Sequence, residues 1–463
     1  MLGKLPHRTL QELAKKYGPI MSMRLGYVPT IVVSSPEAAK LFLKTHDTVF
    51  ASRPKLQVSE YLSYGTKGMA FTEYGPYWRN VRKFCTHELL SAAKIDLFKA
   101  MRREELESLV QSLMVAAKAE VVVDVSEKVF GLTEDMTYRM LFGRNKDHRF
   151  DIKSLVQETM SLAGAFNMAD YLPFFAALDL QGLTRRFKET NKVLDKMLEI
   201  IIEEHMQEAN SGQQSHRHEL DFVDIMLSLM KKSTYTHDEQ SYIIDRTNVK
   251  AIILDMIAGA IDTSATAIEW VLSELLRHPR VMRQLQEELN SVVGMDQIRV
   301  EETDLAKLNY LDMVIKESLR LHPVGTLLVP HESMEDIVID EYYIPKKSRI
   351  IINCWALGRD PKVWSDNVEE FFPERFIGSN IDLRGHDFQL IPFGSGRRGC
   401  PGMHLGLTNI RLVVAQLVHC FHWELPDGMS TSDLDMSEIF GLTSPRAKHL
   451  LAVPTYRLRV QDF

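Results

Sequence analysis

The sequence predicts a mainly α-helical fold with a minor β-strand part, arranged as one large domain over residues 1–463. Apolar residues recur three and four positions apart over long stretches, which is the period of an amphipathic helix. Short apolar or alternating runs, typical of strands, are confined to the two ends of the chain. Length alone allows about three domains, but the chain shows neither an internal repeat nor a low-complexity linker.

Composition excludes several classes of protein. The chain has 463 residues, of which 45 % are hydrophobic and 25 % charged, as in an ordinary folded protein with a large core. Disordered, collagen-like and disulfide-scaffold proteins are therefore excluded. The 62 acidic and 55 basic side chains give a net charge of −7, which argues against a nucleic-acid-binding protein.

The first fifty residues combine a hairpin with two helices. A Gly-Pro pair ends the first helix and a Gly-Tyr pair marks the hairpin turn. A Ser-Pro pair then supplies the N-cap and the first position of the second helix. In chain order we expect these elements over residues 5–17, 20–25 with 30–34, and 37–45.

Amphipathic helices dominate the middle of the chain. The polar segment 211–219 separates two helical patterns, and we interpret it as an exposed loop. A His-Pro pair ends the last of these helices. The expected helices cover residues 93–117, 187–209, 279–293 and 309–321.

The most apolar stretch is residues 249–272, which we interpret as a long buried helix. It contains Lys250, Asp255, Asp262 and Glu269, so it fails the requirement of about 20 apolar residues for a membrane span. No segment resembles a signal peptide.

The C-terminal third is expected to alternate strands with irregular chain. Strands are predicted around residues 336–344 and over 349–352. Residues 360–387 show little periodicity, and a final helix over 404–420 precedes a strand-like tail.

The cysteines point to a reducing compartment. Cys85, Cys354, Cys400 and Cys420 form no CxxC pair, so neither a zinc site nor a redox dithiol is supported. We interpret three of them as buried small hydrophobes. Cys400 differs because it ends a glycine-rich segment.

Residues 393–402 (FGSGRRGCPG) carry the strongest chemical signal. Four glycines in ten residues indicate backbone freedom or the close approach of a bulky group. Cys400 stands at a helix entrance behind two arginines, and amide groups with cationic charge lower a thiol pKa. No second cysteine or histidine stands at ligand spacing, so a metal bound here brings its other ligands with it, as a haem does.

This segment resembles the haem-binding loop of the cytochromes P450, F-x-x-G-x-R-x-C-x-G. Phe393, Gly396, Arg398, Cys400 and Gly402 fill every fixed position. The resemblance implies that Cys400 is the axial thiolate of haem b, that Arg398 reaches a propionate, and that Phe393 packs beside the sulfur.

A second motif lies inside the long apolar helix, at residues 258–264 (AGAIDTS). Gly259 weakens the helix, and a carboxylate at Asp262 is costly unless it is paired. These residues suit either proton relay beside a flat cofactor or a helix kink with a solvated acid. The motif resembles the family's A/G-G-x-D/E-T-T/S, which implies that Asp262 and Thr263 deliver protons for dioxygen activation. Asp255 faces either the substrate cavity or solvent.

Two further motifs are ambiguous by themselves. Glu317 and Arg320 share a helix face and would suit a surface ion pair. They resemble the family's E-x-x-R element, and residues 372–376 resemble its P-E-R-F element, which implies a buried structural triad of Glu317, Arg320 and Arg375.

Trp78 and Arg82 stack on one helix face. They resemble the family's W-R-x-x-R helix, in which both residues bind haem propionates. His331 stands where the family often has arginine; it can donate a hydrogen bond to a propionate but is not always charged.

The resemblance extends over the whole chain. Residues 17–19, 50–54 and 358–361 also match plant microsomal members. Those members begin with a membrane anchor and a proline-rich hinge, so we expect a chain truncated just after the hinge. The resemblance then implies a protein of the endoplasmic reticulum membrane, facing the cytosol.

The implied function is a monooxygenase that hydroxylates an apolar plant specialised metabolite, of the biphenyl, phenylpropanoid or sesquiterpene type. It would use O2 and electrons from NADPH, delivered by NADPH-cytochrome P450 reductase. We expect the reductase to dock at Arg79, Arg82, Lys83 and Arg397 because acidic and basic surfaces attract. By resemblance the pocket is lined by residues 56–71, 251–258, 324–329 and 439–443, of which the last two segments carry no charge.

Two alternatives stay open at this point. A haem-thiolate isomerase or dehydratase needs neither O2 nor the proton relay that Asp262 and Thr263 would supply. A non-catalytic haem-binding protein would lack either the relay or the apolar pocket.

Overall fold

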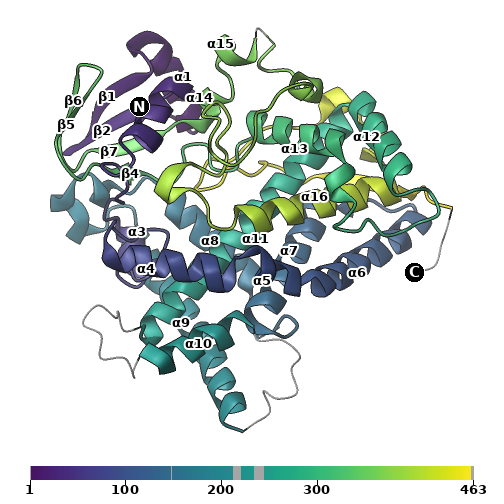
Figure 1. The fold of residues 1–463 in the computed structure, drawn as a ribbon, viewed down its shortest axis with the longest axis horizontal. Helices are drawn as coiled ribbons and strands as arrows, with labels where there is room; N and C mark the ends of the chain where they lie inside the picture. Colours follow the sequence, from purple (N-terminus) through teal and green to yellow (C-terminus); the bar gives the residue numbers. More distant parts are fainter. Residues whose placement is uncertain (1, 148, 212–220, 234–243, 366, 460–463) are drawn as a thin grey trace.

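The computed structural model describes residues 2–147, 149–211, 221–233, 244–365 and 367–459. It confirms the predicted fold class, because helices form most of the molecule and the strands form three small sheets (Figure 1). The helices are α1 (Pro6–Tyr17), α2 (Pro36–Lys40), α3 (Gln57–Leu62), α4 (Pro76–Phe84), α5 (Ala92–Leu97), α6 (Lys99–Lys118), α7 (Val125–Phe142), α8 (Ile152–Gly164), α9 (Leu183–Asn210), α10 (Phe222–Ser233), α11 (Arg246–Arg277), α12 (Pro279–Val292), α13 (Asn309–Leu321), α14 (Cys354–Leu357), α15 (Pro361–Trp364) and α16 (Met403–Cys420).

The largest sheet joins the two ends of the sequence. The predicted hairpin β1 (Ile20–Leu25) and β2 (Val28–Val33) is present, and β2 pairs in parallel with β7 (Arg349–Ile352). β7 in turn pairs antiparallel with β4 (His331–Glu332). The amide of Glu332 donates to the carbonyl of Ser52, so this sheet places residues 50–53 beside His331.

The remaining strands form two small sheets. The predicted strand region near residue 340 is a hairpin of β5 (Ile337–Ile339) and β6 (Tyr342–Ile344). The strand-like tail is β9 (Leu451–Tyr456), which lies between β3 (Val123–Asp124) and β8 (Phe421–Glu424).

The centre of the molecule is occupied by α11, whose side chains are buried along most of its length (Figure 1). Asp245 caps its N-terminus by accepting from the amide of Asn248. An 18-residue window of this helix has a mean hydropathy of 1.5, so by length and composition the helix could cross a membrane. However, 72 % of that window is buried inside the protein. It is therefore the core helix that the sequence predicts.

Two expectations need correction. The single helix expected over 93–117 is two helices, because the chain turns at Phe98 (φ −90°, ψ 10°) and packs that ring edge-on against Phe222. Burial of this aromatic pair offsets the interrupted helical hydrogen bonding. The helix expected over 37–45 also changes from α to π geometry at Leu41. The loop expected over 211–219 lies, apart from Ser211, outside the described residues.

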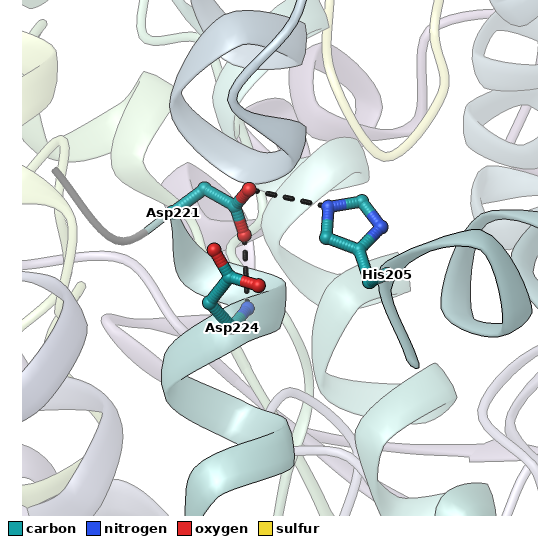
Figure 2. Close-up of side chains that lie close together, drawn as sticks. All are labelled: His205, Asp221 and Asp224. Carbon is teal, nitrogen blue, oxygen red and sulfur yellow. Dashed lines mark hydrogen bonds and ion pairs between the residues drawn. The ribbon is translucent and has the colours of Figure 1, made fainter. Parts of the chain in front are cut away.

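A buried ionic cluster joins α9 to α10, and Figure 2 shows its three side chains, His205, Asp221 and Asp224. His205 Nδ1 lies 2.7 Å from the carbonyl of Ile201, and Nε2 lies 3.2 Å from an Asp221 carboxylate oxygen. Asp221 raises the pKa of His205 against the effect of burial. Through its two ring contacts His205 cross-links α9 to the residue that precedes α10.

Candidate functional site

A cavity of about 370 Å³ lies between α11, α4 and the glycine-rich loop that precedes α16. This volume falls within the roughly 300–1,000 Å³ typical of small-molecule and cofactor sites. The lining brings together most of the predicted site residues, from four separate parts of the sequence. They are Trp78, Arg82, Gly259, Thr263, His331, Phe393, Arg398, Cys400 and Gly402.

The glycine-rich loop holds Cys400 in place through its backbone. The Cys400 amide donates to the carbonyl of Phe393 at 2.8 Å, which closes the loop at the entrance to α16. Gly396 has φ +66°, and a Cβ there would lie 2.4 Å from the carbonyl oxygen of Leu43. Only glycine fits this position, because the backbone is left-handed and a neighbouring chain approaches closely.

The Cys400 side chain lines the cavity and is accessible from it. The sequence predicts a lowered pKa for this thiol, and that prediction is wrong for the protein without a metal. Burial raises the pKa of Cys400, and the Gly402 amide and the Arg82 charge offset this only in part. A metal ion deprotonates a coordinating thiol outright, so the thiolate requires the metal as its counter-charge.

Three arginines face the cavity with no described carboxylate beside them; Arg53 and Arg398 are buried, and Arg82 is partly buried. Arg53 donates to the carbonyls of Ala70 and Pro330, and Arg82 to that of Gly399. None of these guanidinium groups, nor that of Arg398, has an ion pair with a described carboxylate. Burial, together with repulsion from Arg82, lowers the pKa of Arg398 to about 9, and the pKa of Arg53 is also well below its usual range.

Trp78 and His331 complete the cationic wall. The Arg398 guanidinium lies 4.1 Å from the centroid of the Trp78 ring and that of Arg82 lies 6.0 Å away, while the indole N–H donates to the carbonyl of Met69. His331 Nδ1 donates to the carbonyl of Phe50, so in the neutral ring Nε2 carries no proton. Burial and the charges of Arg53 and Arg398 keep the pKa of His331 well below 6.5. His331 therefore donates through Nε2 only when an anion stabilises its second proton.

This arrangement fits a haem. A cluster of buried, unpaired cations is costly unless an anionic group shares the site, and two propionates supply that charge. On the opposite wall Gly259 faces open space, with no heavy atom within 4 Å of a Cβ built there. The cavity thus offers a thiol as a metal ligand, cations for the propionates and an unobstructed helix face for the flat ring.

Asp262 and Thr263 are neighbours in sequence but point in different directions. Thr263 borders the cavity and donates its hydroxyl to the carbonyl of Gly259 at 2.6 Å. Asp262 does not line the cavity; its carboxylate accepts a 2.6 Å hydrogen bond from the hydroxyl of Thr443, which does. Burial raises the pKa of Asp262, and the Thr443 bond opposes that rise.

Glu317, Arg320 and Arg375 meet away from the cavity as one buried cluster. The Glu317 carboxylate lies 2.8 Å from Arg320 and 2.8 Å from Arg375, and it also accepts from the amide of Phe372. The remaining Arg320 donors reach the carbonyls of Gly358, Val368 and Glu370.

The sequence does not indicate a role for Arg53 in the cavity, and it leaves the position of Asp255 open. Arg53 belongs to a segment that matched plant members, but its cavity position depends on the pairing of β4 with residues 50–53. For Asp255 the sequence allows either the cavity or solvent, and the structure places it on the cavity wall.

Comparison with known proteins agrees with this geometry. The sequence profile of the family described as Cytochrome P450 matches residues 1–451. Cytochrome P450 CYP736A12 of Panax ginseng is 64 % identical over 99 % of this chain and 90 % of its own length. Cytochrome P450 84A1 of Arabidopsis thaliana is 43 % identical over 99 % of this chain and 89 % of its own length.

The fold is also that of solved structures. A zebrafish cytochrome P450 solved with progesterone superposes with a TM-score of 0.79 at 25 % identity, covering 98 % of this chain and 99 % of that one. Plant members of the family are typically proteins of the endoplasmic reticulum membrane that receive electrons from a reductase. The chain belongs to the plant group of the cytochrome P450 family, whose members are haem-thiolate monooxygenases.

Proposed function

We propose that residues 1–463 form one catalytic domain that hydroxylates an apolar aromatic of the biphenyl or phenylpropanoid type, or a sesquiterpene. The observation that carries this proposal is the composition of the cavity wall. Methionine side chains are flexible and polarizable, and they make favourable contacts with aromatic rings. Six of them line the cavity, namely Met69, Met101, Met136, Met140, Met160 and Met256.

In this proposal Cys400 would bind the haem iron through its thiolate, and the cations would hold the propionates. When bound, the haem supplies the iron centre at which O2 is activated, so that one oxygen atom enters the substrate and the other leaves as water. Phe393, Gly396 and Gly402 shape the loop around the sulfur, while Trp78, Arg82, His331 and Arg398 bind the cofactor edge. Arg53, on the same wall, contributes a further positive charge.

Asp262 and Thr263 supply protons to the cavity. Burial raises the pKa of Asp262, and this shift toward the protonated form supports a role for the carboxyl group in proton transfer. Its contact with Thr443 provides a hydroxyl that reaches the cavity wall, and Thr263 offers a second hydroxyl on α11. Both hydroxyls donate and accept, which a proton relay requires.

The electron donor in this proposal is NADPH-cytochrome P450 reductase, bound at a basic surface on α4. Arg79 and Lys83 are exposed there and support this docking site. Two residues expected at the same surface contribute less, because Arg82 turns into the cavity and Arg397 pairs with Asp47 at 2.6 Å.

The membrane contact at the cytosolic face of the endoplasmic reticulum is supported by exposed apolar side chains in the segment between α8 and α9. Tyr27, in the β1–β2 turn, lies 5.9 Å ring to ring from Phe174 and extends this group. The exposed members are Tyr27, Phe166, Phe174, Phe175, Leu178 and Leu180.

The first experiment is a spectral titration of the purified ferric protein with biphenyls, cinnamates, flavonoids and sesquiterpenes. A substrate bound near the iron expels its axial water and shifts the Soret band, so a saturable shift with one class identifies the substrate family. With that substrate, Thr263→Ala is expected to consume NADPH without matching product. Unchanged coupling would remove Thr263 from the relay, and a panel without any shift would overturn the substrate proposal.

A further inference from the structure

Asp255 fastens a neighbouring loop to the cavity wall. It stands on α11 four residues before Gly259 and eight before Thr263, on the helix face that borders the cavity. Its Oδ2 accepts from the backbone amides of Met69 at 2.5 Å and Ala70 at 3.1 Å. The side chains of Met69, Ala70 and of the next residue, Phe71, line the cavity.

Gly68 makes this contact possible. A Cβ built on Gly68 would lie 2.3 Å from Asp255 Oδ2 and 3.0 Å from its Cγ. The backbone of Gly68 is not left-handed, so glycine is needed here for space rather than for conformation. Any larger residue would push the carboxylate away from the two amides.

The same loop is held on its other side by residues of the cofactor wall. Trp78 Nε1 donates to the carbonyl of Met69 at 3.1 Å, and Arg53 Nε donates to that of Ala70 at 3.2 Å. The amides of these two residues therefore point to α11 and their carbonyls to the cationic wall. Residues 68–71 form a strip between the cofactor site and the helix above it.

The carboxylate of Asp255 has a cost that packing alone does not explain. It forms no ion pair with a described cation, and burial raises its pKa to about 6 even though the two amides oppose this rise. A neutral side chain would avoid that cost. A buried charge that breaks the rule for core residues indicates a functional position.

We propose that Asp255 is a positioning residue that fixes residues 68–71 as a wall of the substrate cavity and so sets substrate orientation and affinity. The effect on substrate rests on the proposed function, whereas the fastening of the loop does not. Hydrogen bonds to a charged acceptor contribute about 1.5 kcal/mol or more. Loss of the two bonds is therefore expected to raise the equilibrium population of the detached strip by about tenfold or more.

The test uses the haem-loaded protein and four variants. Asp255→Ala removes the acceptor, and Asp255→Asn keeps one accepting oxygen for rescue. Gly68→Ala displaces the carboxylate without changing it. Gly75→Ala is the matched control, because a Cβ there meets nothing within 4 Å and the backbone is extended. Hydrogen exchange of the peptide over residues 66–72 and binding of imidazole and 4-phenylimidazole to the iron are measured.

We expect faster exchange, by about tenfold or more, in Asp255→Ala and Gly68→Ala, with Asp255→Asn nearer to the wild type and Gly75→Ala unchanged. Affinity for 4-phenylimidazole should change several-fold while that for imidazole, which is too small to touch the strip, stays constant. Wild-type exchange in Asp255→Ala, or in Gly68→Ala if the first variant does not fold, would overturn the proposal. Altered exchange in a protein that hydroxylates none of the substrates offered would leave the fastening intact and refute only the substrate proposal.

Discussion

Two of the regions that contain buried arginines surround positive charge in different ways. At the α13 cluster, Arg320 and Arg375 share the carboxylate of Glu317, and backbone carbonyls accept from their other donors. At the cavity, Arg53 and Arg398 also donate to carbonyls, but no described carboxylate pairs with them. The first region is complete within the protein, while the second needs an anion from outside.

This difference should separate residues that maintain the fold from the residues proposed to hold a cofactor. Removing the acid from the complete cluster leaves two buried cations unpaired. Removing a cation from the incomplete cluster relieves repulsion in the protein and weakens its hold on the anion, although it also removes hydrogen bonds to backbone carbonyls. The two regions should therefore respond in opposite ways to substitution.

The largest effect is expected for Glu317→Gln. It leaves Arg320 and Arg375 without a counter-charge, which should lower the free energy of unfolding by about 3–5 kcal/mol. Urea unfolding of the haem-loaded protein should show the Soret and circular-dichroism signals lost together at lower urea. Glu189→Gln, which breaks the exposed pair with Arg185, is the control and should cost less than about 1 kcal/mol. Equal effects of the two substitutions would contradict the distinction.

Arg398→Met should separate cofactor loss from unfolding. The substitution removes one of the charges proposed to bind the propionates, so haem transfer to an acceptor protein should be about 10–100-fold faster. During urea titration the Soret band should disappear before the helical circular dichroism does. Arg320→Met is the comparison and should lose both signals together. Simultaneous loss in Arg398→Met would place Arg398 with the residues that maintain the fold.

Local signals explain why much of the fold was predictable. Residues 309–321 coincide with α13, because apolar spacing and a His-Pro stop both act within the segment. The break at Phe98 was not predictable, since its cause is a ring on α10. Where a helix breaks in this way depends on which side chains become buried together, and that is known only from the folded chain.

The same limit applies to the site. Cys400 and Arg398 were found because their spacing is local, whereas the cavity position of Arg53 depends on β4, 278 residues away. The predicted direction of the Cys400 pKa shift was wrong because the sequence shows the helix-entrance amides and the arginines but does not show how far the thiol is desolvated. Asp255 stayed undecided because its partners are backbone amides, which leave no side-chain pattern.

Asp255→Asn tests the effect of a buried negative charge on stability, through the dependence of the melting temperature on pH. The pKa of Asp255 is raised from 3.8 to about 6, so the folded state binds this proton more tightly and loses stability as pH rises through that window. Above pH 6 this corresponds to up to about 3 kcal/mol. The melting temperature of Asp255→Asn relative to the wild type should therefore be higher at pH 7.5 than at pH 5. A difference independent of pH would show that Asp255 does not titrate in this range.

The smallest effect on stability is expected where charge is exposed. Arg79→Glu with Lys83→Glu should change the free energy of unfolding by less than about 0.5 kcal/mol, since neither side chain is buried. The apparent KM for the reductase should nevertheless rise several-fold, and more steeply at low ionic strength, because the field between the partners is screened by salt. Lys192→Glu, an exposed cation on α9, is the matched control and should leave the KM unchanged. If Lys192→Glu raised the KM as much, the net charge of the protein rather than the α4 surface would govern docking. The α4 cations could then not be distinguished, as a partner-binding group, from the charges that serve the fold and the cofactor.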